Sequence, residues 1–340
     1  MRAIEVNSYG DSDRLEAIDA PIPEPGAGEV RIDVEAAGIN FADVMQRRGQ
    51  YPGGPEPPYV PGMEVAGTVD AVGERAEPPS ADGASGGEPR AATDLEEGDH
   101  VVAMVGRGGY AAYATAPVQS LFPIPEGMAF TEAAGFPVQF LTAYACLFGW
   151  GDLEADESVL IQAAAGGVGT AAVQLASNAG AEVFGTASST GKLELAAELG
   201  CDHPINYEET DFREVVDEQT GGEGVDLVLE SVGGDVFERS LDAMAHFGRM
   251  VTYGVASGEP AAAENRRLLF ENKSVRGFHL GQAAARDPER IVEAVPELTA
   301  GLTNGDLEVV VGETFALEDA ADAHRYLESR KSSGKLVLVV

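Results

Sequence analysis

A glycine-rich segment at residues 163–169 limits what this chain can fold into. It reads Ala-Ala-Ala-Gly-Gly-Val-Gly, follows the apolar run 158–162 and opens an amphipathic stretch at 168–179. This order predicts a dinucleotide-binding turn, because glycine lets the backbone approach a pyrophosphate and the helix N-terminus offers it free N–H groups. An ordinary strand-to-helix turn is the alternative. The residues expected to contact the cofactor are Ala164, Gly166, Gly167, Val168 and Gly169, with Ala164 standing where the usual pattern has its first glycine.

The sequence around this turn predicts an α/β fold, and a length of 340 residues favours two domains. After residue 157, apolar strands alternate with amphipathic helices, as in a doubly wound parallel sheet. The expected strands are 158–162, 182–187, 226–231, 248–253 and 275–280, and the expected helices are 168–179, 191–199, 236–245, 288–300 and 318–329. The first third has short strands instead, at 1–6, 29–39, 65–72, 100–105 and 109–116, which predict a compact β-rich unit.

The end of the second strand after residue 157 indicates which nicotinamide cofactor fits. An NAD site needs Asp or Glu there to hold the ribose 2′-hydroxyl. This strand ends without an acid, and Ser188, Ser189 and Lys192 follow. Hydroxyl donors and a cation suit a 2′-phosphate, so the sequence predicts NADPH. The alternative for Lys192 is an ordinary surface lysine.

The charge balance excludes several partners. The chain has 22 basic and 57 acidic residues, a net charge of −35, and lysine at four positions only. Such a surface repels nucleic acid and anionic membranes. We hypothesise a halophilic protein, since concentrated salt screens this self-repulsion. Residues 1–9 show no signal pattern and no apolar run is long enough to span a bilayer, so we expect a soluble cytoplasmic protein.

Residues 74–97 form a polar, acidic stretch without apolar periodicity, which predicts a long exposed loop inserted in the β-rich part. Neither the two cysteines, Cys146 and Cys201, nor the five histidines stand at metal-ligand spacing. We therefore expect two buried thiols and no metal site.

Together these features resemble the medium-chain dehydrogenase/reductase superfamily, in its zinc-independent quinone oxidoreductase branch. The motifs that carry the resemblance are Ala-Ala-Gly-Ile-Asn-Phe-Ala-Asp-Val-Met at 36–45, Gly-Gln-Tyr-Pro at 49–52 and Pro-Gly-Met-Glu-Val-Ala-Gly at 61–67. Val-Thr-Tyr-Gly at 251–254 and Gly-Phe-His-Leu-Gly at 277–281 are similar to the subgroup of the synaptic vesicle amine-transport protein homologues. The resemblance covers nearly the whole chain.

The resemblance implies a GroES-like catalytic domain of residues 1–123 and 283–340 and a Rossmann domain of residues 124–282, with the nicotinamide in the cleft between them. Zinc-dependent relatives place a cysteine where Asn40 stands and a histidine where Met63 stands. Their structural zinc lobe matches the acidic stretch, which has no cysteine. The resemblance therefore implies chemistry without zinc.

The resemblance also implies roles for individual residues. Asn40 and Tyr51 are expected near the nicotinamide, where they can hydrogen-bond a developing oxyanion. Backbone capping is the alternative for Asn40, and a mobile lid is the alternative for Tyr51. The other matching positions are Thr142, beside the cofactor, and Tyr207, Phe278 and Lys335, as cofactor contacts. Gly233 and Gly254 are also expected to contact the cofactor, because they follow two of the expected strands at the carboxyl edge of the sheet, where a dinucleotide lies.

The activity implied is hydride transfer from NADPH to a quinone, which accepts hydride without a Lewis acid. Two alternatives stay open: an NADPH-dependent enone or enoyl reductase, and a non-catalytic regulatory protein that binds NADPH. The family also implies a homodimer built through the strand at 275–280.

Overall fold

The computed structural model describes residues 1–74 and 95–340, which form two compact units. Unit 1 contains residues 1–138 and 311–340, and unit 2 contains residues 139–310. The family-based boundaries at 123/124 and 282/283 differ from these limits and stay a prediction. The predicted acidic loop at 74–97 lies outside the described residues, apart from its first residue and its last three.

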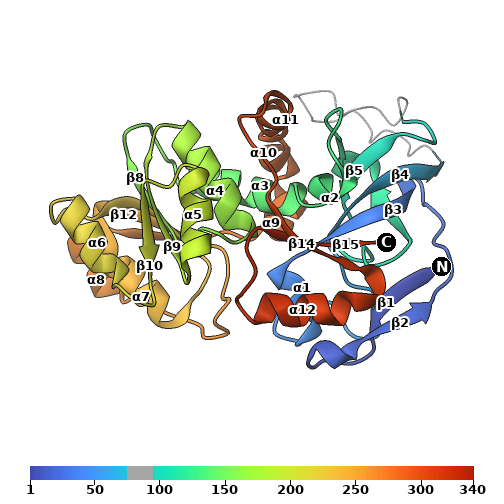
Figure 1. The fold of residues 1–340 in the computed structure, drawn as a ribbon, viewed down its shortest axis with the longest axis horizontal. Helices are drawn as coiled ribbons and strands as arrows, with labels where there is room; N and C mark the ends of the chain where they lie inside the picture. Colours follow the sequence, from blue (N-terminus) through green and yellow to red (C-terminus); the bar gives the residue numbers. More distant parts are fainter. Residues whose placement is uncertain (75–94) are drawn as a thin grey trace. The chain divides into compact units, whose positions relative to one another are not determined.

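Unit 2 is built on a parallel sheet with the strand order β10-β9-β8-β11-β12-β13. The chain passes from β8 to β9 and β10 on one side (Figure 1) and then to β11, β12 and β13 on the other, so the order reverses between β8 and β11. Helices α4 and α5 pack on β8, β9 and β10, and α6 packs against α7, which lies on β11 and β12. The strands are β8 (Ser158–Ile161), β9 (Glu182–Ala187), β10 (His203–Asn206), β11 (Val225–Glu230), β12 (Met244–Thr252) and β13 (Ser274–Gly277).

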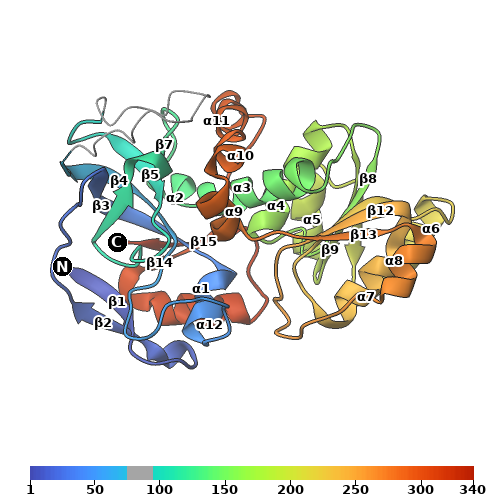
Figure 2. The same ribbon diagram turned by 180° about the vertical axis from the view of Figure 1, so that it is seen from behind.

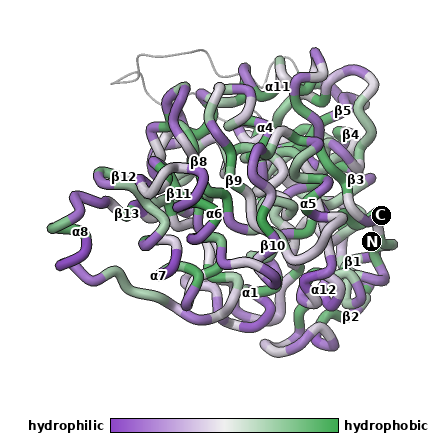
Figure 3. Tube along the Cα trace, turned by 60° about the vertical axis from the view of Figure 1, so that its left-hand side comes forward, coloured by the Kyte–Doolittle hydropathy of each residue, from purple (hydrophilic) through white to green (hydrophobic). Residues whose placement is uncertain are grey.

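The helices of this part of the chain confirm the predicted α/β alternation. They are α3 (Pro137–Tyr144), α4 (Gly167–Asn178), α5 (Thr190–Glu198), α6 (Phe212–Gln219), α7 (Gly234–Ala243), α8 (Asn265–Glu271), α9 (Leu280–Arg286), α10 (Pro288–Val292) and α11 (Val295–Asn304). A π-helical turn, Ala145–Gly149, continues α3. In Figure 3 strands β9 and β11 are mostly hydrophobic, as expected for strands covered by helices on both faces.

Several details of unit 2 differ from the sequence prediction, which also contained no helix at the positions of α3, α8 and α9. Strand β10 and helix α6 were not predicted, because Pro204 and the acidic residues hide their periodicity. The helix expected at 288–300 is two helices, since Pro296 stands at the start of α11, where its missing N–H costs nothing. The strand expected at 275–280 ends at Gly277, and His279 caps helix α9.

Unit 1 is the predicted β-rich part. Its sheet has the order β14-β15-β3-β4-β5-β7, with β6 also paired to β3, and β1 and β2 form a separate ribbon. The strands are β1 (Arg2–Val6), β2 (Leu15–Asp19), β3 (Glu29–Ile39), β4 (Glu64–Val72), β5 (His100–Met104), β6 (Tyr113–Pro117), β7 (Leu121–Pro123), β14 (Val311–Ala316) and β15 (Lys335–Val339), and the helices are α1 (Phe41–Arg47), α2 (Phe130–Ala133) and α12 (Ala320–Glu328). Strand β15 lies between β14 and β3, so the last strand is internal to this sheet.

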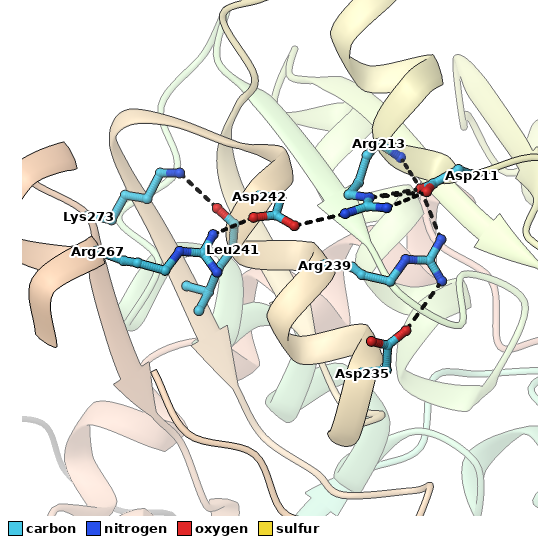
Figure 4. Close-up of polar contacts among 8 residues, drawn as sticks. All are labelled: Asp211, Arg213, Asp235, Arg239, Leu241, Asp242, Arg267 and Lys273. Carbon is cyan, nitrogen blue, oxygen red and sulfur yellow. Dashed lines mark hydrogen bonds and ion pairs between the residues drawn. The ribbon is translucent and has the colours of Figure 1, made fainter. Parts of the chain in front are cut away.

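An ion-pair network on unit 2 joins helices α6, α7 and α8 (Figure 4). Asp211 lies 2.6 Å from Arg213 and 2.9 Å from Arg239, and Asp242 lies 2.9 Å from Arg213 and 2.6 Å from Arg267. The pKa of Asp211 is lowered well below its usual range, first by its hydrogen bonds from Arg213 and then by those from Arg239. The network therefore holds Asp211 and Asp242 against arginines in a strongly acidic chain.

Candidate active site

The glycine turn leads from β8 into α4, as predicted. Ala163 takes a φ of 56°, and its carbonyl accepts a hydrogen bond from Gly166 N at 2.9 Å. A Cβ on Gly169 would lie 2.2 Å from Ala163 O, so only glycine allows α4 to start this close to the turn. A Cβ on Gly166 would meet only Ala163 O, at 3.3 Å, so the other side of the turn is open. Because Gly166 caps α4 and leaves this approach open, the turn fits a pyrophosphate.

A buried network of polar side chains, which the sequence prediction missed, holds the glycine turn in place. Thr186 Oγ1 accepts from Ala163 N at 3.3 Å and donates to Gln162 Oε1 at 2.7 Å. Gln162 Nε2 in turn donates to Ser240 Oγ at 3.0 Å. All three side chains are buried. They tie the turn to strand β9 and helix α7 and so preorganise it.

The predicted 2′-phosphate residues gather where β9 and β10 end. Ser189 caps α5, Lys192 follows in its first turn, and Tyr207 N donates to Ala187 O at 3.1 Å. Ser188 is half-buried and Tyr207 is exposed. Burial lowers the pKa of Lys192. The corner offers two hydroxyls and an ammonium group, a donor set that fits a phosphate.

The predicted residues at the other strands also lie at the carboxyl edge of the sheet. Gly233, with a φ of 79°, begins the approach to α7, and a Cβ on Gly254 would lie 2.9 Å from Ser231 O. Phe278 is buried, with its ring centroid 4.8 Å from that of Trp150. Glu230, which the prediction missed, accepts from Val232 N at 2.6 Å and from Gly233 N at 2.8 Å, and thereby fixes the loop after β11.

Asn40 in unit 1 is held by two side chains. It stands at the start of α1, where its backbone N–H donates to Asp43 Oδ2 at 2.8 Å. Its side-chain Nδ2 donates to Glu64 Oε1 at 2.9 Å, and its Oδ1 accepts from Lys335 Nζ at 2.7 Å. The carboxamide is therefore fixed by Glu64 and Lys335, and Nδ2 carries a second N–H besides the one that Glu64 accepts.

Glu64 and Lys335 form a buried ion pair. Their exposed side-chain fractions are 0% and 3%, and Glu64 Oε2 also accepts from Val138 N at 2.8 Å. The structure thus places Lys335, predicted as a cofactor contact, on Glu64 and Asn40. Glu64 lies in strand β4, one residue after Met63.

A chain of buried titratable groups continues behind Asn40. Tyr110 Oη donates to Asp43 Oδ2 at 3.2 Å and lies 3.1 Å from His324 Nε2. Burial raises the pKa of Asp43 to about 6 and lowers that of His324 to about 3. Arg47, fully buried, lies 2.6 Å from Glu328. In the sequence these residues stand out only as polar residues inside apolar segments, and the pattern does not show that they contact one another.

The two remaining predicted catalytic residues lie in different units. Tyr51 is half-buried in the turn after α1, and its pKa is raised by burial and then by the charge of Asp43. Thr142 lies in α3, within unit 2, and is 6% exposed. Asn40, Tyr51 and Lys335 therefore lie in unit 1, and Thr142 and the glycine turn lie in unit 2.

Within residues 1–74 and 95–340, no group of three His, Cys, Asp or Glu side chains has the arrangement of a metal site. Over the same residues, none of the helices is both long and apolar enough to cross a membrane.

Comparisons with known proteins match both units. The model of the alcohol dehydrogenase GroES-like domain matches residues 26–126, and that of the zinc-binding dehydrogenase family matches residues 167–300. The human synaptic vesicle membrane protein VAT-1 homolog is 34% identical over 358 residues, with 100% of this chain and 86% of that protein covered.

Solved structures cover the whole chain as well. The Escherichia coli quinone oxidoreductase complexed with NADPH is 32% identical, with a TM-score of 0.90 and 100% of both chains covered. The CurK enoyl reductase is 32% identical, with a TM-score of 0.85 and 99% and 98% covered. The fold and the glycine turn define the class of this protein, a dinucleotide-binding oxidoreductase with a GroES-like unit. The chain belongs to the quinone oxidoreductase-like branch of the medium-chain dehydrogenase/reductase superfamily.

Proposed function

We propose that this protein binds NADPH and reduces a quinone to its hydroquinone. Bound NADPH supplies a hydride from its nicotinamide, and one further proton completes the two-electron reduction. The glycine turn and the corner of Ser188, Ser189 and Lys192 support the choice of cofactor, as does the likeness to a quinone oxidoreductase complexed with NADPH.

The observation that carries the proposal is the fixed carboxamide of Asn40. Glu64 and Lys335 hold it, so its remaining N–H points in one direction without reorganisation during the reaction. Such a donor stabilises the oxyanion that forms as a quinone carbonyl accepts hydride. Tyr51 is the second donor that we assign to this oxyanion, and Thr142 lies beside the cofactor in this assignment.

The experiment is NADPH oxidation with a panel of quinones and enones in high-salt buffer, with NADH measured in parallel. We expect turnover with quinones and a preference for NADPH. Turnover with enones alone would replace the quinone assignment with the alkene reductase alternative, which the likeness to an enoyl reductase supports. Binding of NADPH without turnover on either class would favour the regulatory alternative.

We also propose a homodimer through β13. This strand lies beside β12 (Figure 2) and is the last in the strand order of the parallel sheet, and edge strands present unpaired backbone groups. The preceding helix α8 leaves Leu269 and Phe270 each 71% exposed, an apolar surface beside that edge. Sedimentation of the wild type and of Phe270→Asp tests this, and a monomeric wild type would contradict it.

A further inference from the structure

The side-chain amide of Gln139 is buried and makes no hydrogen bond within the described part of the chain. It is 1% exposed, and within the described residues neither its Nε2 nor its Oε1 has a hydrogen-bond partner. A buried amide normally satisfies both atoms, because an unpaired donor or acceptor loses its water without compensation. An unpaired amide in unit 2 therefore indicates a ligand group that brings both a donor and an acceptor.

The topology of unit 2 places Gln139 at the edge of the sheet that carries the glycine turn. Tyr144 and Phe148, at the end of α3 and its π-helical continuation, line a groove with Leu175 and Asn178 at the end of α4. Both segments thus end on the same side, near the amino edge of β8, and both begin at the carboxyl edge. Gln139 lies five residues before Tyr144, about 7.5 Å closer to that edge at 1.5 Å per residue.

Helix α3 lies over the half of the sheet opposite the corner of Ser188, Ser189 and Lys192, where we expect the adenosine end of the cofactor. The segment that follows α3 places Gly151 against Leu227 of β11, where an added Cβ would lie 2.9 Å from the leucine side chain. The Trp150 ring packs on Phe278, after β13. The corner of Ser188 and Lys192 follows β9, on the other side of the glycine turn. A dinucleotide crossing this edge therefore brings its nicotinamide riboside end to α3.

We propose that Gln139 hydrogen-bonds the nicotinamide riboside end of NADPH through both atoms of its side-chain amide. The nicotinamide carboxamide and the ribose hydroxyls each supply a donor and an acceptor, as Gln139 requires. A quinone or an enone supplies acceptors only and would leave Oε1 unpaired. The inference rests on the cofactor of the proposed function and adds the residue that recognises its reactive end.

The test is calorimetric binding to wild type and Gln139→Leu of three ligands: NADPH, 2′-phospho-ADP-ribose, which lacks the nicotinamide, and 2′,5′-ADP, which lacks the nicotinamide and the second ribose. We expect the variant to bind NADPH about tenfold more weakly, the size of one or two hydrogen bonds, and 2′,5′-ADP unchanged. Unchanged 2′-phospho-ADP-ribose binding would identify the carboxamide as the partner, and a loss equal to that of NADPH would identify the ribose.

Gln174→Leu is the matched control. Gln174 is also buried in unit 2, but its amide bonds Thr170 O, Glu308 O and Glu308 N at 2.8–3.1 Å. Gln174→Leu should therefore lower the melting temperature of the ligand-free protein without changing selectivity among the three ligands. Gln139→Leu should leave that melting temperature unchanged or raise it, since no protein bond is lost. Gln139→Met, which keeps the side-chain length, replaces the leucine variant if that variant does not fold.

Unchanged NADPH affinity in the variant, or equal weakening of NADPH and 2′,5′-ADP, would overturn the inference. Unchanged affinity with a lower melting temperature would mean that Gln139 holds a buried water instead. A wild type that binds NADPH but reduces no quinone would contradict the proposed acceptor and leave this inference intact. A wild type that binds no NADPH would contradict both.

Discussion

The Nζ atom of Lys335 lies 2.7 Å from Oδ1 of Asn40, although 295 residues separate the two in the chain. Lys335 also neutralises Glu64, which is fully buried. We predict that Lys335→Met destabilises the folded protein by about 3–5 kcal/mol, because it leaves Glu64 buried and unpaired. Urea unfolding measures this. The double variant Glu64→Gln with Lys335→Met should recover most of the loss, and Lys331→Met, at an exposed position, should change little. A single variant as stable as the wild type would contradict the pairing.

Removal of Lys192 tests the choice of cofactor. Lys192→Ala should raise the KM for NADPH by about ten- to a hundredfold, the size of a charge-assisted hydrogen bond, and should leave the KM for NADH nearly unchanged. Steady-state kinetics with both cofactors measures the difference. Lys331→Ala is the control for a general loss of positive charge. An equal effect on NADPH and NADH would reject the 2′-phosphate assignment.

The hydroxyl of Tyr51 is predicted to stabilise charge in the transition state. Tyr51→Phe keeps the ring and should lower kcat on the order of a hundredfold, with a smaller effect on the KM for NADPH. Tyr113→Phe, on strand β6, is the matched control. An unchanged kcat would mean that Tyr51 serves only to pack the turn after α1.

His324 should make the stability depend on pH. Its pKa is lowered to about 3, first by burial and then by the charge of Arg47. The unfolded chain binds a proton at this residue near pH 6.5, so the contribution is complete above that pH and is lost as the pH falls toward 3. Between pH 6 and 4 the loss is roughly 2–3 kcal/mol.

Urea unfolding of wild type and His324→Gln across pH 4–7 measures this slope. The variant should lose less stability on acidification than the wild type. His246→Gln, at an exposed histidine, should follow the wild type. Parallel pH profiles for wild type and His324→Gln would contradict the assignment.

Salt should stabilise this protein. With a net charge of −35, the folded chain repels itself at low ionic strength. We predict a higher melting temperature in 3 M KCl than in 0.1 M KCl. Calorimetric scans at both concentrations check this, and equal melting temperatures would reject the halophile hypothesis.

Local patterns predicted the glycine turn, the alternating strands and helices and the β-rich first part, because each depends on residues close together in the chain. The partners of Asn40 could not be predicted this way. Glu64 and Lys335 are 24 and 295 residues away from it, and a charged residue in a strand ordinarily indicates a solvent-facing position. Gln139 gave no signal either, because only packing shows that its amide is buried and unpaired.

The position of β15 inside the sheet of unit 1 has a consequence for biosynthesis. Unit 2 is continuous and is complete once residue 310 has left the ribosome. Unit 1 must wait for Leu336, Val337 and Leu338, which pair with β3, made about 300 residues earlier. At a translation rate of about 5–20 residues per second, Glu64 remains without its cation for roughly 14–55 s. All of unit 2 is therefore synthesised before the last strand of unit 1.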